Sequence, residues 1–207
     1  MSPRVVTVAN YKGGSSKTTT SVFLAHALAE RHLRVVLVDA DPQASASRWR
    51  ELAGAPFVTI AAMPVTQLDR QLWRTLDPDR WDVAVIDCPP QEEREGIVVG
   101  AVRAATDVLV PLAPTMAEYD RIGPTIALLH GEGVRNARAV LTRTVPNASS
   151  TEVYRMQLAA DGLPVLPVVI PRREAYAQAL GDTVPARDVP YGLVAEYLTD
   201  SWKAITA

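Results

Sequence analysis

The stretch Ala9-Asn10-Tyr11-Lys12-Gly13-Gly14-Ser15-Ser16-Lys17-Thr18-Thr19-Thr20 lies between an apolar, strand-like run at 5–8 and a helical pattern at 18–32. A strand, a glycine-containing loop and a helix in this order are typical of a phosphate-binding turn. Gly13 and Gly14 let the backbone approach an anion, and the helix start near Lys17 directs N–H groups toward it. We therefore expect Lys17 on the β- and γ-phosphates of a nucleotide and the Thr18 hydroxyl on Mg²⁺.

The general phosphate-loop pattern G-x-x-x-x-G-K-[ST] is not met, because Tyr11 and Ser16 stand at its two glycine positions. Two outcomes are open at Ser16. With φ below zero the serine is tolerated, whereas φ above zero costs about 1 kcal/mol and weakens nucleotide affinity or turnover. The simpler alternative for the whole loop is a glycine-rich turn with two solvated lysines.

Short apolar runs alternate with segments of helical length and pattern along the chain. The runs are continuous, which favours strands buried on both faces of a parallel sheet. The expected strands are 5–8, 35–38, 58–61, 82–86, 107–112, 137–141 and 165–170. The expected helices are 18–32, 43–52, 66–76, 97–105, 119–129, 151–161 and 193–204. This order predicts an α/β fold: one domain over residues 1–207, a doubly wound, mostly parallel sheet with helices on both faces, and ligands at the carboxyl ends of the strands.

The composition is that of a globular protein with balanced charge. The 207 residues are 48% hydrophobic and 21% charged, and the net charge of −2 excludes a uniformly basic nucleic-acid coat but leaves room for a local basic patch. Cys88 is the single cysteine, so an internal disulfide is excluded. No apolar stretch reaches the roughly 18 residues of a membrane span, and no signal-peptide pattern opens the chain. These features predict a cytoplasmic protein.

Lysine is rare in this chain. Of the 21 basic residues only Lys12, Lys17 and Lys203 are lysines. Two of the three fall in the phosphate loop, where a compact ammonium fits among phosphates better than a planar guanidinium. The distribution supports a phosphate-binding role for both.

The loop resembles the deviant Walker A box K-G-G-x-G-K-[ST] of the ParA/MinD family of P-loop ATPases, and Ala9-Asn10-Tyr11 matches the run before that box in partition ATPases. The resemblance implies a Mg²⁺-dependent ATPase whose signature lysine is Lys12. In this family that lysine reaches the phosphates of a partner subunit, so ATP would hold a homodimer together. Lys12 and Lys17 are then catalytic residues. The loop residues implied to bind ATP are Lys12, Gly13, Gly14, Ser15, Ser16, Lys17, Thr18 and Thr19.

Two acidic motifs follow at later strand ends. Asp39-Ala40-Asp41-Pro42-Gln43 resembles the family's D-x-D-P-Q switch I box. This implies that Asp41 positions or activates the attacking water and joins the Mg²⁺ shell, with Asp39 in support. The alternative for Asp41 is a cap on the following helix, and both roles can hold at once.

The second motif, Asp87-Cys88-Pro89-Pro90, resembles the family's D-x-P-P Walker B motif. It implies that Asp87 binds Mg²⁺ through water. Cys88 is expected to be a small buried side chain with no redox task.

Basic residues in the C-terminal half are candidate base and DNA contacts. In this family the loops after the last strands contact the nucleotide base, which implies roles for Thr142-Arg143 and for 170–173, with Pro171 and Arg172 as nucleotide contacts. Partition ATPases of the family bind DNA non-specifically as ATP dimers, which implies DNA contacts from Arg143, Arg172 and Arg173. The alternative is that these arginines form a solvated face or internal ion pairs.

The function implied by the resemblance is an ATP-dependent DNA partition ATPase, in which an ATP sandwich dimer binds DNA non-specifically and a ParB-like partner stimulates hydrolysis and release. Such a protein is cytoplasmic and nucleoid-associated. No membrane attachment is expected, because the last predicted helix has Lys203 as its only cation against Glu196 and Asp200. No helix-turn-helix domain fits before Lys12, so operator recognition is not expected.

Three alternatives stay open. The first is a ParA-like ATPase that positions a protein cargo. The second is an ATP-dependent metabolic ligase or kinase of the same fold, because a fold alone does not fix the phosphoryl acceptor. The third is a nucleotide-binding switch that no longer hydrolyses ATP because of Ser16.

Overall fold

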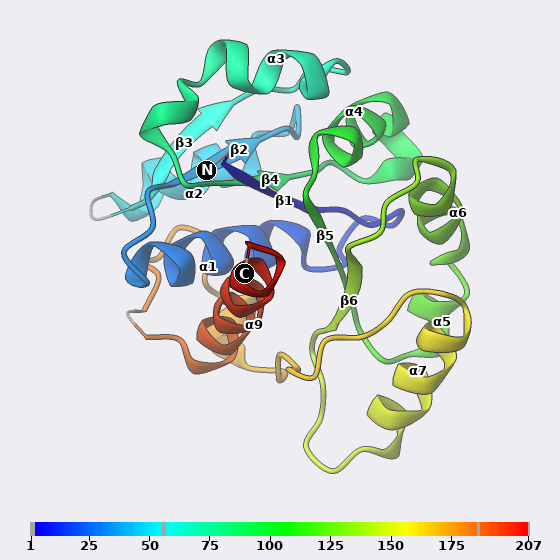
Figure 1. Ribbon diagram of the computed structural model, residues 1–207. Coiled ribbons are helices and arrows are strands. Elements are labelled where there is room, and N and C mark those ends of the chain that lie inside the picture. The colour runs from blue at the N-terminus through cyan, green and yellow to red at the C-terminus, as the bar shows by residue number, and fades with distance from the viewer. Residues whose placement is uncertain (1–2, 55–56, 186, 207) are drawn as a thin grey trace.

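The described strands form one six-stranded sheet in which every pair of neighbours is parallel. The computed structural model describes residues 3–54, 57–185 and 187–206, and the strand order is β3-β2-β4-β1-β5-β6 (Figure 1). The strands are β1 (Arg4–Val8), β2 (Val35–Asp39), β3 (Thr59–Ala62), β4 (Val83–Asp87), β5 (Asp107–Leu112) and β6 (Ala137–Leu141). The predicted α/β class with a doubly wound parallel sheet is confirmed.

Helices cover both faces of this sheet (Figure 1). One apolar layer is completed by α3 (Leu68–Thr75), α4 (Gln91–Ala104), α6 (Gly123–Gly131) and α7 (Ser149–Ala160). The other is completed by α1 (Lys17–Glu30), α2 (Ser45–Ala53) and α9 (Val189–Thr206). Side chains of β2 alternate between the layers, with Val36 and Val38 in the first and Val35 and Leu37 in the second. Both faces of the strand are buried, which explains its continuous apolar run.

The prediction of a strand at 165–170 is wrong. This segment runs beside β6 but makes only isolated bridges, from Ala139 to Val165 and from Thr144 to Pro171. Proline has no N–H to donate, and Pro164 and Pro167 interrupt the ladder at this edge. The segment covers the edge of β6 without extending the sheet.

Two predicted helices differ most from the helices of the structure. The helix expected at 119–129 is broken into α5 (Met116–Tyr119) and α6, and Pro124 stands in the first turn of α6. Proline is favoured at a helix start and excluded from a helix interior, so the chain restarts there. Helix α4 begins at Gln91, six residues before the expected start, and a kink at Arg94 separates the added turn. A short helix α8 (Glu174–Ala177) and a 3₁₀ turn at Pro78–Arg80 had not been expected.

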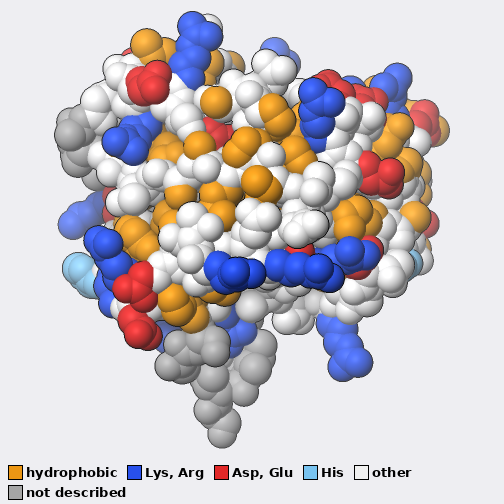
Figure 2. All heavy atoms as spheres, turned by 90° about the horizontal axis from the view of Figure 1, so that it is seen from above, with side chains coloured by type: hydrophobic (Ala, Val, Ile, Leu, Met, Phe, Trp, Pro, Cys, Tyr) orange, Lys and Arg blue, Asp and Glu red, His pale blue; other side chains and the backbone are white. Residues whose placement is uncertain are grey.

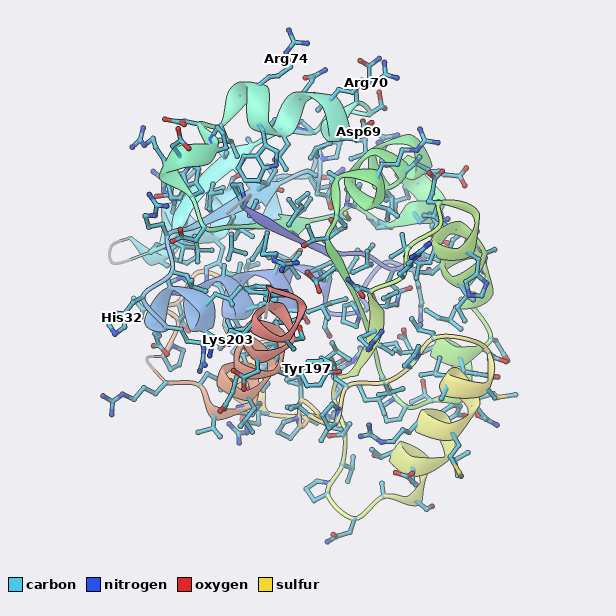
Figure 3. The ribbon with its side chains drawn as sticks, viewed as in Figure 1. His32, Asp69, Arg70, Arg74, Tyr197 and Lys203 are labelled. Atoms are coloured by element: carbon cyan, nitrogen blue, oxygen red, sulfur yellow. The ribbon has the colours of Figure 1, made fainter. Side chains whose placement is uncertain are left out.

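A buried polar contact joins α9 to β5. Trp202 Nε1 donates to Asp107 Oδ2 at 3.0 Å, and Thr106 Oγ1 donates to the same oxygen at 2.7 Å. Burial raises the pKa of Asp107, and these hydrogen bonds oppose the shift. Tyr197 and Lys203 of α9 lie on the side of the sheet that carries α1 (Figure 3). In the part of the chain that the structure describes, no helix has both the length and the apolar character needed to cross a membrane.

Gly100 of α4 sets how closely α4 approaches the segment before α3, because a Cβ at this position would overlap the carbonyl oxygen of Thr66. We expect Gly100→Ala to lower the free energy of unfolding by roughly 2 kcal/mol, the usual range for overpacking against backbone. Gly131→Ala is the matched control, since its Cβ would meet nothing within 4 Å. Urea denaturation followed by circular dichroism measures both, and equal effects of the two changes would contradict the packing role of Gly100.

Candidate nucleotide-binding and hydrolysis site

The carboxyl ends of β1, β2 and β4 meet at one edge of the sheet. In the strand register Val8 of β1 and Asp39 of β2 both lie beside Asp87 of β4. The phosphate loop starts one residue after Val8. Parallel pairing thus brings the loop and both acidic motifs to one place, although they are far apart in the sequence.

The phosphate loop curls so that the carbonyl group of Lys12 faces Lys17. Lys17 Nζ donates to the Lys12 carbonyl oxygen at 2.8 Å, and Ser15 Oγ donates to the same oxygen at 3.2 Å. Lys17 is only 6% exposed, so it is not a solvated lysine. Burial lowers the pKa of Lys17, and the negative charge of Asp87 opposes this shift most strongly.

Two residues of the loop have left-handed backbone, Gly14 with φ of 72° and Ser16 with φ of 70°. Of the two outcomes open at Ser16, the structure shows the strained one, because a serine at positive φ is disfavoured by about 1 kcal/mol. Ser16 therefore adopts the conformation that glycine would adopt at this position of the general pattern.

Hydrogen bonds fix the loop to β5 and α6. Asn10 Nδ2 donates to the Pro111 carbonyl at 2.8 Å, and Asn10 Oδ1 accepts from the Lys12 N–H at 3.1 Å. The Tyr11 N–H donates to Thr125 Oγ1 at 2.8 Å. The loop conformation is thus held from outside the loop.

The two aspartates after β2 have different surroundings. Asp39 is buried, and its Oδ2 accepts from the backbone N–H of Ser47 at 2.8 Å and from Ser47 Oγ at 2.7 Å. Asp41 lines a cavity, and its Oδ1 accepts from the Gln43 N–H at 2.9 Å. Asp39 therefore stabilises the turn between β2 and α2. Asp41 shapes the turn before α2 and also faces the cavity. It does not cap α2, because the N-cap position is Ala44, which makes no side-chain capping hydrogen bond.

Asp87 is a fully buried carboxylate with capacity for a cation. Its Oδ1 accepts from Ser21 Oγ at 2.9 Å, whereas its Oδ2 has no hydrogen-bond partner among the described residues. Burial raises the pKa of Asp87 to about 7, and the charge of Asp39 adds to the shift, while a hydrogen bond from Thr18 opposes it. A buried, half-satisfied carboxylate beside a threonine hydroxyl suits Mg²⁺, which commonly binds one or two carboxylates together with substrate phosphates.

Cys88, the next residue, is buried at the cavity wall. Burial and the charge of Asp87 raise its pKa, so the thiol stays protonated and is a poor nucleophile.

A cavity of about 1140 Å³ opens beside the loop, large enough for a nucleotide. It gathers ten of the predicted site residues. These are Gly14, Ser16, Lys17, Thr18, Thr19, Asp41, Arg143, Pro171, Arg172 and Arg173. The remaining four, Lys12, Gly13, Ser15 and Asp87, are not part of the lining.

The lining also includes residues that had not been predicted, among them Glu118, Tyr176 and Tyr191. Tyr191 is buried, and its hydroxyl lies 3.2 Å from Thr20 Oγ1. Arg173 stacks 5.9 Å from the centre of the Tyr176 ring. In a sequence, a tyrosine within an apolar pattern is indistinguishable from a residue of the hydrophobic core. The sequence therefore could not predict that Tyr176 and Tyr191 line the cavity.

Residues 6–186 match the family of CobQ/CobB/MinD/ParA nucleotide-binding domains. The chain belongs to this family. It is 31% identical over 212 residues to maintenance of carboxysome distribution protein A of Gloeobacter kilaueensis, covering 97% of this chain and 96% of that protein. It is 27% identical over 180 residues to protein ParA of Rhizobium radiobacter, covering 84% of this chain and 80% of that protein.

Among solved structures, cobyrinic acid a,c-diamide synthase of Mycobacterium smegmatis with bound ADP and magnesium has a TM-score of 0.75 and 26% identity, over 97% of this chain and 96% of that one. Membership in this family makes the chain an ATP-binding P-loop protein, and the residues at the cavity fit ATP and Mg²⁺. When bound, Mg²⁺ neutralises charge on the phosphates.

Replacing Ser16 with glycine should remove the strain at this position. We expect Ser16→Gly to raise the free energy of unfolding by about 0.5 kcal/mol, because the relief exceeds the extra freedom of glycine in the unfolded chain. Ser149→Gly, at the first residue of α7, is the control and should not stabilise, because Ser149 is not among the residues with positive φ. Thermal unfolding measures both, and a loss of stability in Ser16→Gly would contradict the strain.

Proposed function

We propose that the chain is an ATPase that uses Mg²⁺-ATP to switch between a monomer and a DNA-binding homodimer. The observation that carries the proposal is the set of side chains around one cavity. Lys17 and Thr18 stand at the helix start, Asp41 faces the cavity, and Asp87 lies buried behind Lys17 with a free oxygen. Phosphoryl transfer to water depends mostly on placement and charge stabilisation, and these groups supply both.

In this proposal Asp41 positions the attacking water. Asp39 is engaged with Ser47, which leaves Asp41 as the carboxylate of the pair at the cavity. Lys17 binds the β- and γ-phosphates, and Asp87 holds Mg²⁺ through water with help from Thr18. Lys12 contacts the nucleotide of the partner subunit.

We propose that the cargo is moved over nucleoid DNA, so the protein is nucleoid-associated in the cytoplasm. For the cargo itself, a plasmid or chromosome site bound by a ParB-like protein was the first expectation from the sequence. The relative from Gloeobacter kilaueensis, which matches this chain over nearly its whole length, is named for carboxysome distribution. This similarity favours a protein assembly as the cargo. Deleting the gene distinguishes these: loss of a replicon from daughter cells indicates a DNA cargo, and clustering of a protein body indicates a protein cargo.

A metabolic ligase of the same fold is the third candidate, supported by the similarity to a structure named cobyrinic acid a,c-diamide synthase. Such an enzyme transfers the phosphoryl group to a small molecule, so it does not need Lys12 for catalysis. Unchanged ATP turnover in Lys12→Ala favours this candidate over the dimeric switch.

ATP turnover with purified protein tests the ATPase. We expect Lys17→Ala and Asp41→Ala each to lower turnover at least about 100-fold, because each removes charge stabilisation or placement at the reacting phosphate. Lys203→Ala is the matched lysine control, since Lys203 lies on α9 away from the loop (Figure 3). Turnover close to wild type in both Lys17→Ala and Asp41→Ala would exclude the proposed site.

A second basic surface, away from Arg143, Arg172 and Arg173, is an alternative candidate for the DNA contact. Seen from above, a row of basic side chains crosses the face below a group of hydrophobic ones (Figure 2). Arg70 and Arg74 of α3 point outward at the end of the molecule opposite α7 (Figure 3). The cavity arginines are favoured because a dimer across the cavity would bring two sets of them together.

Salt dependence of DNA binding tests this assignment. We expect Arg173→Gln, in the presence of ATP, to weaken binding equally for all sequences and to lower the slope of log affinity against log salt by about two, one per subunit. Arg70→Gln removes the same charge from α3 and should leave the slope unchanged. A loss of slope in Arg70→Gln alone would place the DNA contact on α3.

A further inference from the structure

Glu118 is a buried acid in the wall of the nucleotide cavity. It belongs to α5 and is only 7% exposed. Its Oε1 accepts from Lys12 Nζ at 3.4 Å and from Arg143 Nη2 at 3.1 Å. Its Oε2 is buried and has no hydrogen-bond partner in the described part of the chain. Among the described ion pairs, this cluster alone connects the phosphate loop with the loop after β6.

The two cations hold Glu118 differently. A buried carboxylate is costly unless it is paired. Arg143 makes the shorter contact from a backbone with φ of 54°, a conformation that a non-glycine residue rarely adopts. Arg143 therefore makes the shorter of the two ion pairs that neutralise Glu118. The carboxylate stays paired even when Lys12 is absent.

Lys12 makes the longer contact with Glu118, at 3.4 Å against 3.1 Å for Arg143. The Lys12 side chain is 31% exposed and that of Arg143 is 43% exposed, so solvent reaches both cations. The Lys12 backbone is fixed separately, because the carbonyl accepts from Lys17 and Ser15 and the N–H donates to Asn10. The side chain can therefore leave Glu118 without any rearrangement of the loop.

We propose that Glu118 is a positioning residue that holds Lys12 within its own subunit until the phosphates of a nucleotide in a second subunit compete for it. This rests on the proposed ATP-dependent dimer. Each Lys12 exchanges a carboxylate for a phosphate group, and Arg143 keeps Glu118 neutralised during the exchange. Glu118 thereby sets the protein concentration at which ATP produces the dimer.

The first experiment measures dimerisation by sedimentation velocity with saturating ATPγS and Mg²⁺, over a range of protein concentrations. Glu118→Gln removes the charge at nearly constant volume. It should lower the dissociation constant of the dimer about fivefold, because two partly exposed ion pairs no longer have to be broken. Asp120→Asn is the matched control: this acid is exposed, lies two residues away and should leave the constant unchanged.

The second experiment observes Lys12 directly. Because the chain has three lysines, labelling with ¹³Cε-lysine gives a spectrum of three signals, which Lys12→Arg and Lys203→Arg assign. Without nucleotide, Glu118→Gln should move the Lys12 signal to the position of a free lysine and leave the Lys203 signal unchanged. ATPγS should move the wild-type Lys12 signal at protein concentrations where the dimer forms, and thermal unfolding verifies that Glu118→Gln is folded.

The outcomes separate the positioning role from the dimer itself. If the wild type dimerises and Glu118→Gln dimerises no more tightly, the role of Glu118 is overturned while the proposed function stands. An unchanged Lys12 signal in Glu118→Gln also overturns that role. If neither protein dimerises with ATPγS, the dimeric switch and the exchange at Lys12 are both overturned.

Discussion

The register of β1, β2 and β4 is the constraint on which the site depends. Pairing in parallel places Val8, Asp39 and Asp87 side by side, so a phosphate loop and two carboxylates share one edge. Burial raises the pKa of Asp87, and the negative charge of nearby Asp39 adds to the rise. Asp39 is neutralised locally by hydrogen bonds from Ser47. In the described part of the chain Asp87 Oδ1 accepts from Ser21 Oγ and Oδ2 has no hydrogen-bond partner. This incomplete satisfaction suits Asp87 to a metal ion.

Glu118, in the wall of the cavity, has two cationic partners. Arg143 Nη2 makes the shorter contact at 3.1 Å and Lys12 Nζ the longer one at 3.4 Å. Such an arrangement keeps the charge of the protein interior balanced before and after a ligand arrives, which limits the energetic cost of changing partners.

Much of the fold was predictable because strands buried on both faces have continuous apolar runs. Six of the seven runs are strands, although β3 is partly exposed. The seventh fails because Pro164 and Pro167 remove N–H donors from a run that is apolar enough for a strand. The order of motifs predicted that Lys17, Asp41 and Asp87 come together at one edge of the sheet. It could not predict the contact of Glu118 with Lys12, because this contact arises from the packing of α5 against the loop. Nor could it decide the backbone at Ser16, since both signs of φ are open to a serine in a loop.

The hydrogen bonds that hold the phosphate loop also connect it to distant surface. Asn10 is bonded to the end of β5, and the N–H of Tyr11 is bonded to Thr125 in the first turn of α6. Helix α6 follows directly after α5, and both lie toward the outside of the molecule (Figure 1). A protein that binds there and shifts α6 therefore acts on the phosphate loop at the hydrogen bond from the Tyr11 N–H to Thr125 Oγ1. Leu129 of α6 also belongs to the first apolar layer, so such a shift reaches the core as well as the loop.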